Sequence, residues 1–293
     1  MSKFNSVWSF GTSFTAENIV DALNECDLDF EVQKSPLLAT TPNTIVPKMV
    51  GTFRTDTGAV LGVVGKDYGI VNNRDAFEFA DLIENLTWET GGYTEAGLAF
   101  LVGRLPDRTI NNEEYIPYIV FQNSFNGRWN LKGQILLRDK AHGYIVNLPF
   151  ASDIKIRHSS RAEDRVRLAK QALLAVDKYI GDFAAEAASL SGITISDAAL
   201  EVVVSDLFPI KTGDSDRVRD NQLAKREDFI ASYSEDQTWW GTGWGVIKAF
   251  ADFSAKCNSK LASKNRRRAE TVLENTLISG KNYKKLIAKL ESL

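Results

Sequence analysis

The hydrophobic and polar positions of the chain follow a two-residue period in its first half, which predicts strands. Three β-rich runs occupy residues 95–106, 114–125 and 129–139, and residues 142–150 add a shorter run. Asn126-Gly127 predicts a tight hairpin turn between the second and third runs, because both residues accept positive φ.

An earlier hairpin is predicted over residues 48–64, where Asp56-Thr57-Gly58 forms the turn between two alternating runs. Before it, residues 30–37 read as an extended segment that ends at its proline. Together with the three later runs, this hairpin predicts one mostly antiparallel sheet of about five to seven strands.

Two helices are predicted within this first half. Thr15 is the expected N-cap of a helix over residues 16–26. A strand from residue 66 then leads to a second, amphipathic helix with Asn73 as its cap. Helical spacing gives this second helix a buried stripe of Ala76, Phe77, Ala80 and Ile83, with Leu82 at its margin.

From Ser159 onward the period becomes helical. Ser160 and Glu163 form a capping box for a long helix over residues 161–191, and Gly192 ends it. Its core-facing stripe is Val166, Ala169, Leu173, Val176, Ile180, Phe183 and Ala187. Further helices are predicted over 197–207, 215–233, 243–261, 264–279 and 282–292.

These patterns predict an α+β protein with a mostly antiparallel sheet and packed helices first, and a helical part after it. The expected division is a sheet-rich domain over residues 1–158 and a helical region over residues 159–293. The helical region either stands alone or packs on the first domain as one unit.

The segment "QTWWGTGWGVIKAFADF", residues 237–253, concentrates three tryptophans among glycines. Thr242 resembles an N-cap, which places Trp244 in a first helical turn facing the core. Trp239 and Trp240 are adjacent, so at most one of them faces inward in an extended segment. The other is a candidate platform on which a nucleobase could stack.

The composition indicates which class of protein the chain belongs to. The chain has 293 residues, of which 44% are hydrophobic and 25% charged, which is typical of a globular protein. No apolar run approaches the ~20 residues that cross a bilayer, and the first residues lack the layout of a secretory signal. We therefore expect a protein of the cytoplasm with no membrane partner.

Catalytic motifs are not recognisable. The only histidines are His142 and His158 and the only cysteines are Cys26 and Cys257, too few for a His/Cys metal site. Neither a phosphate-binding P-loop nor a nucleophile elbow occurs. We predict no metal, no cofactor and no enzymatic activity.

Charge is unevenly distributed. The net charge is −3, yet residues 256–293 carry ten Lys/Arg against three Glu, so the rest of the chain sums to −10. A basic tail of this kind either binds a polyanion or forms the solvated face of helices.

Three groups of side chains are candidates for anion or nucleic-acid binding. The first precedes and enters the long helix, where amides and guanidinium groups suit phosphate oxygens; nearby carboxylates could equally neutralise it in surface pairs. The second begins a helix in the basic tail, and the third lies on the last helix. Their members are Lys155, Arg157, His158, Arg161 and Arg165; Arg266, Arg267 and Arg268; and Lys284 and Lys285.

The sequence also resembles a known family, the phage/plasmid-like proteins catalogued as domain of unknown function 932. The resemblance rests on residues 57–72, on Gly241 to Gly245 and on the Arg157-His158 pair. It departs from the family after the sheet, where the stretch 136–150 keeps Arg138 and Asn147 but has no cysteine. The resemblance implies a bacteriophage or prophage context and no established activity.

Three functions follow as hypotheses. The first is a non-enzymatic protein that binds single-stranded DNA, or anneals it, in phage replication or recombination in the cytoplasm of a bacterial host. The alternative is a host-directed protein that binds and blocks a bacterial defence complex, which the acidic body and the aromatic content favour. An enzyme of unrecognised type that uses His158 is a third reading. Self-association as a homo-oligomer is compatible with each.

Overall fold

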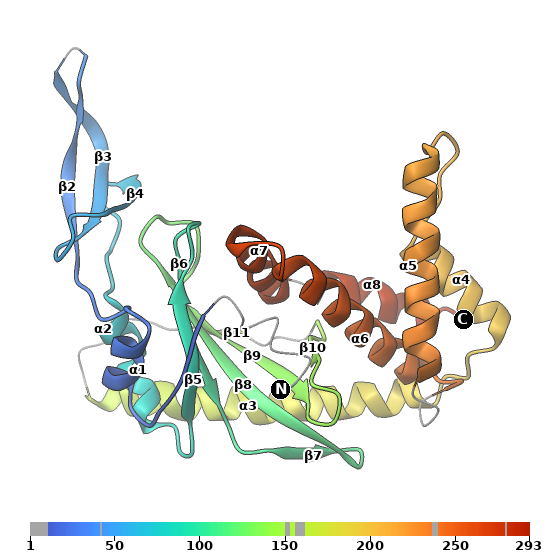
Figure 1. Ribbon diagram of the computed structural model, residues 1–293. Coiled ribbons are helices and arrows are strands. Elements are labelled where there is room, and N and C mark those ends of the chain that lie inside the picture. Colours follow the sequence, from blue (N-terminus) through green and yellow to red (C-terminus); the bar gives the residue numbers. More distant parts are fainter. Residues whose placement is uncertain (1–10, 42, 150–152, 156–161, 236–239, 279) are drawn as a thin grey trace.

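The computed structural model describes residues 11–41, 43–149, 153–155, 162–235, 240–278 and 280–293. It shows the predicted α+β architecture, with an antiparallel sheet region first and a helical region after it (Figure 1). No helix among the described residues is long and apolar enough to cross a membrane.

The main sheet has eight strands, and every pairing in it is antiparallel. Its order is β1-β5-β6-β8-β9-β10, with β7 beside β8 and β11 beside β9. The three β-rich runs predicted from alternation are confirmed as β6, β8 and β9. The bounds are β1 Thr12–Ala16, β5 Thr87–Tyr93, β6 Leu98–Arg104, β7 Arg108–Ile110, β8 Glu113–Ser124, β9 Lys132–Asp139, β10 Ile145–Val146 and β11 Asp153–Lys155.

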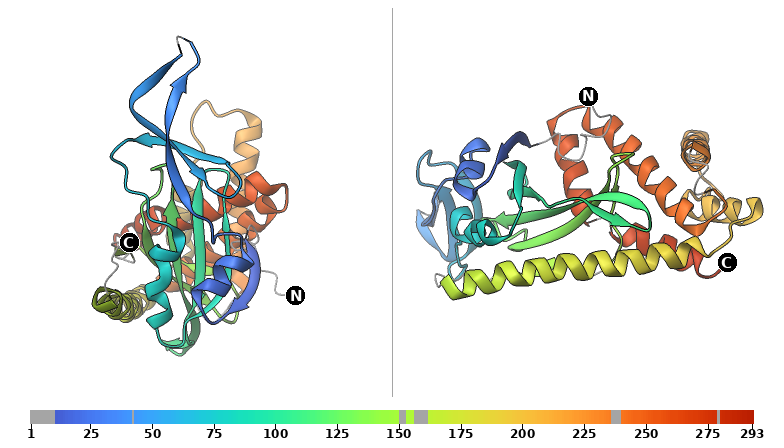
Figure 2. Two further views of the ribbon diagram at one scale, coloured as in Figure 1. Left: turned by 90° about the vertical axis from the view of Figure 1, so that its left-hand side faces the viewer. Right: turned by 90° about the horizontal axis from the view of Figure 1, so that it is seen from below.

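The early hairpin does not join this sheet, contrary to our expectation of a single sheet. β2 (Val32–Ala39), β3 (Thr44–Arg54) and β4 (Val60–Gly65) form a separate three-stranded sheet, which we call the arm. The arm projects from the body (Figures 1 and 2). The predicted turn is confirmed, with Gly58 at φ 70°. β2 runs on past Pro36, which an edge strand tolerates.

Contacts at one end of the arm hold it to the main sheet. The Thr52 hydroxyl donates to the Phe125 carbonyl at 2.7 Å, and the Tyr68 hydroxyl donates to the Ser124 carbonyl at 2.8 Å. These partners lie at the end of β8 and just after it. The connection from β8 to β9 spans residues 125–131, longer than the expected two-residue turn, and only Gly127 of the Asn126-Gly127 pair has positive φ.

Two predicted helix starts are wrong in position. Thr15 lies in β1, and Asn18 caps α1 (Ile19–Glu25) by accepting the Asp21 amide at 3.0 Å. Asn72, and not Asn73, is the cap of α2 (Asn73–Phe77), because the buried Asn73 side chain donates to the Leu28 carbonyl.

The helix that follows is also shorter than predicted. α2 gives way to the 3₁₀ helix η1 (Glu78–Leu82), and residues 66–72 form no strand. Ala76, Phe77, Ala80 and Ile83 are buried as predicted, whereas Leu82 at the margin of the stripe is exposed.

The helical half matches the sequence prediction closely. α3 runs along the main sheet and extends past it toward α4 (Figure 2). Its predicted stripe is buried at Ala169, Val176, Phe183 and Ala187 and half-buried at Leu173 and Ile180, while the Val166 side chain lies outside the described set. The helices are α3 Ala162–Ser191, α4 Asp197–Leu207, α5 Asp216–Glu235, α6 Gly243–Ala262, α7 Arg266–Ile278 and α8 Gly280–Leu290.

α6 starts as predicted at the tryptophan-glycine segment. The Thr242 hydroxyl accepts the Gly245 amide at 3.0 Å, and the buried Trp244 packs edge-on against Phe183 of α3. A Cβ at Gly243 would lie 2.9 Å from the Leu190 carbonyl oxygen, so only glycine lets α6 approach α3 this closely.

A buried ionic cluster joins α6 to the main sheet. Lys248, which is 4% exposed, contacts Glu113 and lies 3.3 Å from the Asp139 carboxylate, which is 3% exposed. The Tyr115 hydroxyl donates to Glu113 at 2.7 Å, and His142 donates its backbone amide to Asp139 at 2.8 Å. Each carboxylate therefore has a second donor, as a buried charge requires.

We expect Lys248→Met to lower the free energy of unfolding by about 3–5 kcal/mol, because it leaves the buried Asp139 and the half-buried Glu113 without this cation. The control Lys260→Met, also on α6, removes a cation that is 75% exposed and should cost less than ~1 kcal/mol. Urea unfolding followed by circular dichroism measures both. Equal values for the two variants would contradict a stabilising role for the cluster.

Candidate functional site

The basic group at the start of the long helix lies largely outside the described residues. This applies to Arg157, His158 and Arg161, and to the side chain of Arg165. Lys155 is in β11, where its backbone pairs with Lys132 of β9. The anion site proposed for this group therefore stays a prediction.

Of the two aromatic candidates the structure describes only Trp240, which is not brought to the arginines of α7. Trp239 lies outside the described residues, and Trp240 is 61% exposed just before α6. Arg266 follows the other end of α6, whose 20 residues span about 30 Å. A ligand that contacts both Trp240 and the arginines of α7 would therefore have to span this distance.

The start of α7 carries the densest exposed positive charge among the described residues. Arg266, Arg267 and Arg268 are all exposed, as is Lys264 just before them. Arg266 lies 3.8 Å from Glu270, whereas Lys264, Arg267 and Arg268 form no ion pair with any described residue. We call Lys264, Arg267 and Arg268 the basic end of α7.

Two side chains of the basic end border a hollow. Arg267 and Arg268, with Asn265 and Thr271, line a space of about 420 Å³. The Asn265 side chain caps the helix by accepting the Arg268 amide at 3.0 Å. Guanidinium groups beside a helix start are suited to phosphate oxygens.

Packing of α7 on the main sheet fixes where this hollow lies. Leu273 and Leu277 pack in a cluster with Leu98 and Phe100 of β6. The buried Glu270 accepts the Glu95 amide at 3.1 Å, which ties the first turns of α7 to the β5–β6 turn. The Asn147 side chain donates to the Thr276 carbonyl at 2.9 Å and holds the other end.

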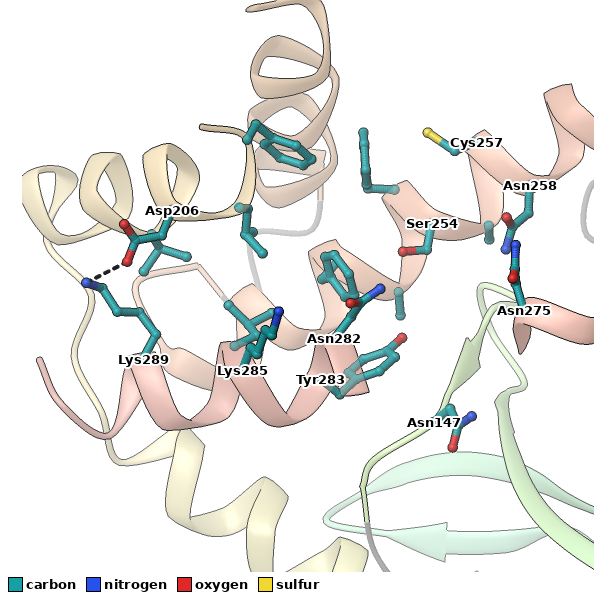
Figure 3. Close-up of a pocket in the computed structure, with 18 of the residues that line it drawn as sticks. Asn147, Asp206, Ser254, Cys257, Asn258, Asn275, Asn282, Tyr283, Lys285 and Lys289 are labelled. Carbon is teal, nitrogen blue, oxygen red and sulfur yellow. Dashed lines mark ion pairs between the residues drawn. The ribbon is translucent and has the colours of Figure 1, made fainter. Parts of the chain in front are cut away.

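The last helix contributes to a different feature. Lys284 and Lys285 are both exposed on α8, and Lys285 lines a groove of about 1160 Å³ between α4, α6, α7 and α8 (Figure 3). Lys289 of α8 bridges the groove to Asp206 of α4 at 2.7 Å. The structure therefore separates the two lysines from the basic end of α7.

The groove combines an aromatic wall with amide side chains. Phe250 and Tyr283 pack edge-on within it, and Asn258 and Asn275 lie close to one another at one end (Figure 3). Burial raises the pKa of Cys257, so its thiol is protonated near neutral pH and is a poor nucleophile. The residues that line the groove come from four helices and from the segment of β10, and no local sequence pattern marks them.

No cluster of three or more metal-ligating side chains occurs among the described residues. The described surface is suited to binding. The start of α7 is basic and can bind an anion, and the groove is lined by apolar and amide side chains and can bind an apolar or amide-bearing group.

The chain belongs to the family described as Domain of unknown function (DUF932), which matches residues 60–135 and 144–276. The match covers β4 of the arm, most of the main sheet and the helices from α2 to most of α7. Comparison with curated proteins and with solved structures gives no match.

The docking of α7 gives a pH-dependent prediction. Burial raises the pKa of Glu270, so its ionised form opposes folding once the pH exceeds the ordinary value of about 4.3. Glu270→Gln keeps an acceptor for the Glu95 amide and removes the charge. We expect this variant to be more stable than wild type at neutral pH, and the difference to vanish below about pH 4.

Thermal unfolding followed by circular dichroism across this pH range measures the effect. The exposed control Glu227→Gln on α5 should follow the wild-type profile. A Glu270→Gln protein that is less stable than wild type at neutral pH would show that the carboxylate itself is needed.

Proposed function

We propose that the chain is a non-enzymatic protein that binds single-stranded DNA through the basic end of α7. The observation that carries the proposal is that Lys264, Arg267 and Arg268 are exposed together and have no described carboxylate partner. Phosphates supply the missing counter-charge, and release of their counterions drives such binding.

The surroundings of the basic end favour a flexible strand. Lys256 and Lys260 lie four residues apart on α6, where Lys256 pairs with Asp252 and Glu235. Lys264 follows two residues after the end of this helix. Trp240 lies about 30 Å away at the start of the same helix. A single strand can bend to reach separated cations and an aromatic ring, whereas a duplex requires one continuous surface.

The family resemblance suggests where this binding acts. A phage or prophage protein of this kind would handle single strands during replication or recombination, in the cytoplasm of a bacterial host. Annealing of complementary strands is the more specific form of the proposal.

Salt-dependent binding tests it. The triple variant Lys264→Ala/Arg267→Ala/Arg268→Ala should bind a labelled single-stranded oligonucleotide more weakly. Its slope of log affinity against log salt should fall by about 2, at ~0.7 per lost phosphate contact. Fluorescence anisotropy over a salt series gives both values.

A matched control removes three cations elsewhere. Lys211→Ala/Arg217→Ala/Arg219→Ala changes exposed positions before and within α5 and should keep the wild-type slope. Wild-type protein without salt-sensitive binding would refute the function. Equal slopes for the two triple variants would instead refute the site.

Trp240 gives a separate prediction. Trp240→Ala should weaken single-strand binding by about 1–3 kcal/mol per stacked base and leave the salt slope unchanged, because stacking releases no counterions. Anisotropy with the same oligonucleotide measures this. Unchanged affinity would remove Trp240 from the contact surface.

A host protein complex is the competing partner, and one surface favours it. Residues 16–31 contain six carboxylates and no Lys or Arg, and α1 displays Asp21 and Glu25 on its exposed side. An acidic surface can occupy the DNA-binding face of another protein. Affinity purification from infected cells, with half of the sample treated with nuclease, separates the two: a partner retained after nuclease treatment favours the host protein.

A further inference from the structure

One side of α7 leads from the hollow at its start to the groove between α4, α6, α7 and α8. Arg268, Thr271 and Asn275 are spaced at i, i+3 and i+7, which places them on the same side of the helix. Arg268 and Thr271 line the hollow, and Asn275 lines the groove. The helix rises only about 10 Å between Arg268 and Asn275, so the hollow and the groove are neighbours on one surface.

The end of the groove nearest the connection from α6 to α7 carries two amide side chains. Asn258 of α6 is half-buried and Asn275 of α7 is exposed, and they lie close to one another (Figure 3). Neither side chain has a hydrogen-bond partner among the described residues. A carboxamide presents a donor beside an acceptor, so each of them can pair with a ligand that carries the complementary groups on one edge.

Buried rings form an apolar wall of the groove beside these amides. Phe250 and Phe253 of α6 and Tyr283 of α8 belong to this wall, and each is less than a tenth exposed. The volume of about 1160 Å³ slightly exceeds the ~300–1,000 Å³ of typical small-molecule sites, so a planar ring can enter without displacing the wall. An apolar wall with a few hydrogen-bonding groups suits a flat heteroaromatic ring, whose faces are apolar and whose edges are polar.

The groove also has one positive charge without a counter-charge. Asp206, Lys285 and Lys289 are the charged side chains among the described residues that line it. Lys289 and Asp206 pair with one another at 2.7 Å across the end opposite the amides (Figure 3). Lys285, which lies between this pair and the amides, forms no ion pair with any described residue. The groove is therefore complementary to a ligand that carries a negative charge beside its ring.

We infer that the groove receives an unstacked nucleobase of the single strand that the basic end of α7 binds. The inference rests on the proposed DNA binding and adds to it a contact that recognises the base in place of the backbone.

A nucleobase in a strand has each feature that the groove requires. Its faces are apolar, its edge carries donors and acceptors for Asn258 and Asn275, and its neighbouring phosphate can pair with Lys285. These edges are accessible in a single strand, because its bases can be splayed out of the stack. A purely apolar ligand would leave both amides without partners, and a simple anion would make no use of the rings.

A comparison of strands with and without bases tests the inference. Asn258→Leu/Asn275→Leu keeps the size of both side chains and removes their hydrogen-bonding groups. The probes are a labelled single-stranded oligonucleotide and a deoxyribose-phosphate strand of the same length that has no bases. By fluorescence anisotropy the double variant should bind the intact strand at least about fivefold more weakly than wild type, the lower limit for one amide–base pair. Both proteins should bind the abasic strand equally. Stacking on Trp240 is common to both proteins and cancels in this comparison.

A matched control changes two asparagines outside the groove. Asn24→Leu/Asn221→Leu alters exposed amides of α1 and α5 and should bind both strands like wild type. Asn258→Ala/Asn275→Ala replaces the leucine variant if circular dichroism shows that it misfolds. Unchanged binding of the intact strand by the groove variant, or an equal loss on both strands, would overturn the inference and leave the salt-dependent phosphate binding in place. Wild-type protein without salt-sensitive binding would instead refute the proposed function, and the base contact with it.

Discussion

The position of α6 depends on the buried contact of Lys248 with Glu113 and Asp139. A lysine is brought out of water at this point only because two carboxylates of the main sheet, themselves bonded to Tyr115 and His142, receive it. The other features of the helical half are positioned by α6. Trp244 at the start of α6 packs against α3, and Phe250 in the middle of α6 lines the groove. The basic end of α7 follows the last residue of α6. A rotation of α6 would therefore move Trp240, the groove and the basic end of α7 together.

Sequence periodicity predicted those helices and strands that bury one face against the core, because their pattern is visible within a short stretch of sequence. The helices from α3 to α8 and the strands β6, β8 and β9 were located because each alternates or repeats against one core. Errors occurred where a distant partner outweighed a local preference. Asn73 would be a good cap in isolation, but its side chain turns inward to the Leu28 carbonyl, and pairing of β1 with β5 draws Thr15 into a strand. The separation of the arm from the main sheet has no local signal either, since alternation does not say which strands are neighbours.

The candidate site, too, could be predicted only in the part that depends on local sequence. The arginines of α7 could be named from the sequence, because a run of three cations needs no tertiary information. That Arg266 leans toward Glu270 while Arg267 and Arg268 border a hollow depends on the packing of α7, which fixes which side of the helix faces the sheet. The groove could not be predicted, because Asn147 after β10, Asn258 of α6 and Asn275 of α7 line it from distant parts of the sequence. The Lys248 cluster joins residues 135 positions apart for the same reason.

Three cations make a weak and strongly salt-dependent contact with phosphates. The basic end of α7 would therefore hold a single strand only together with a further contact. Trp240 offers a contact of a different kind, about 30 Å away at the other end of α6, because stacking on an exposed ring releases no counterions. The distance between the two points favours a ligand that bends, because α6 holds them apart at a fixed separation.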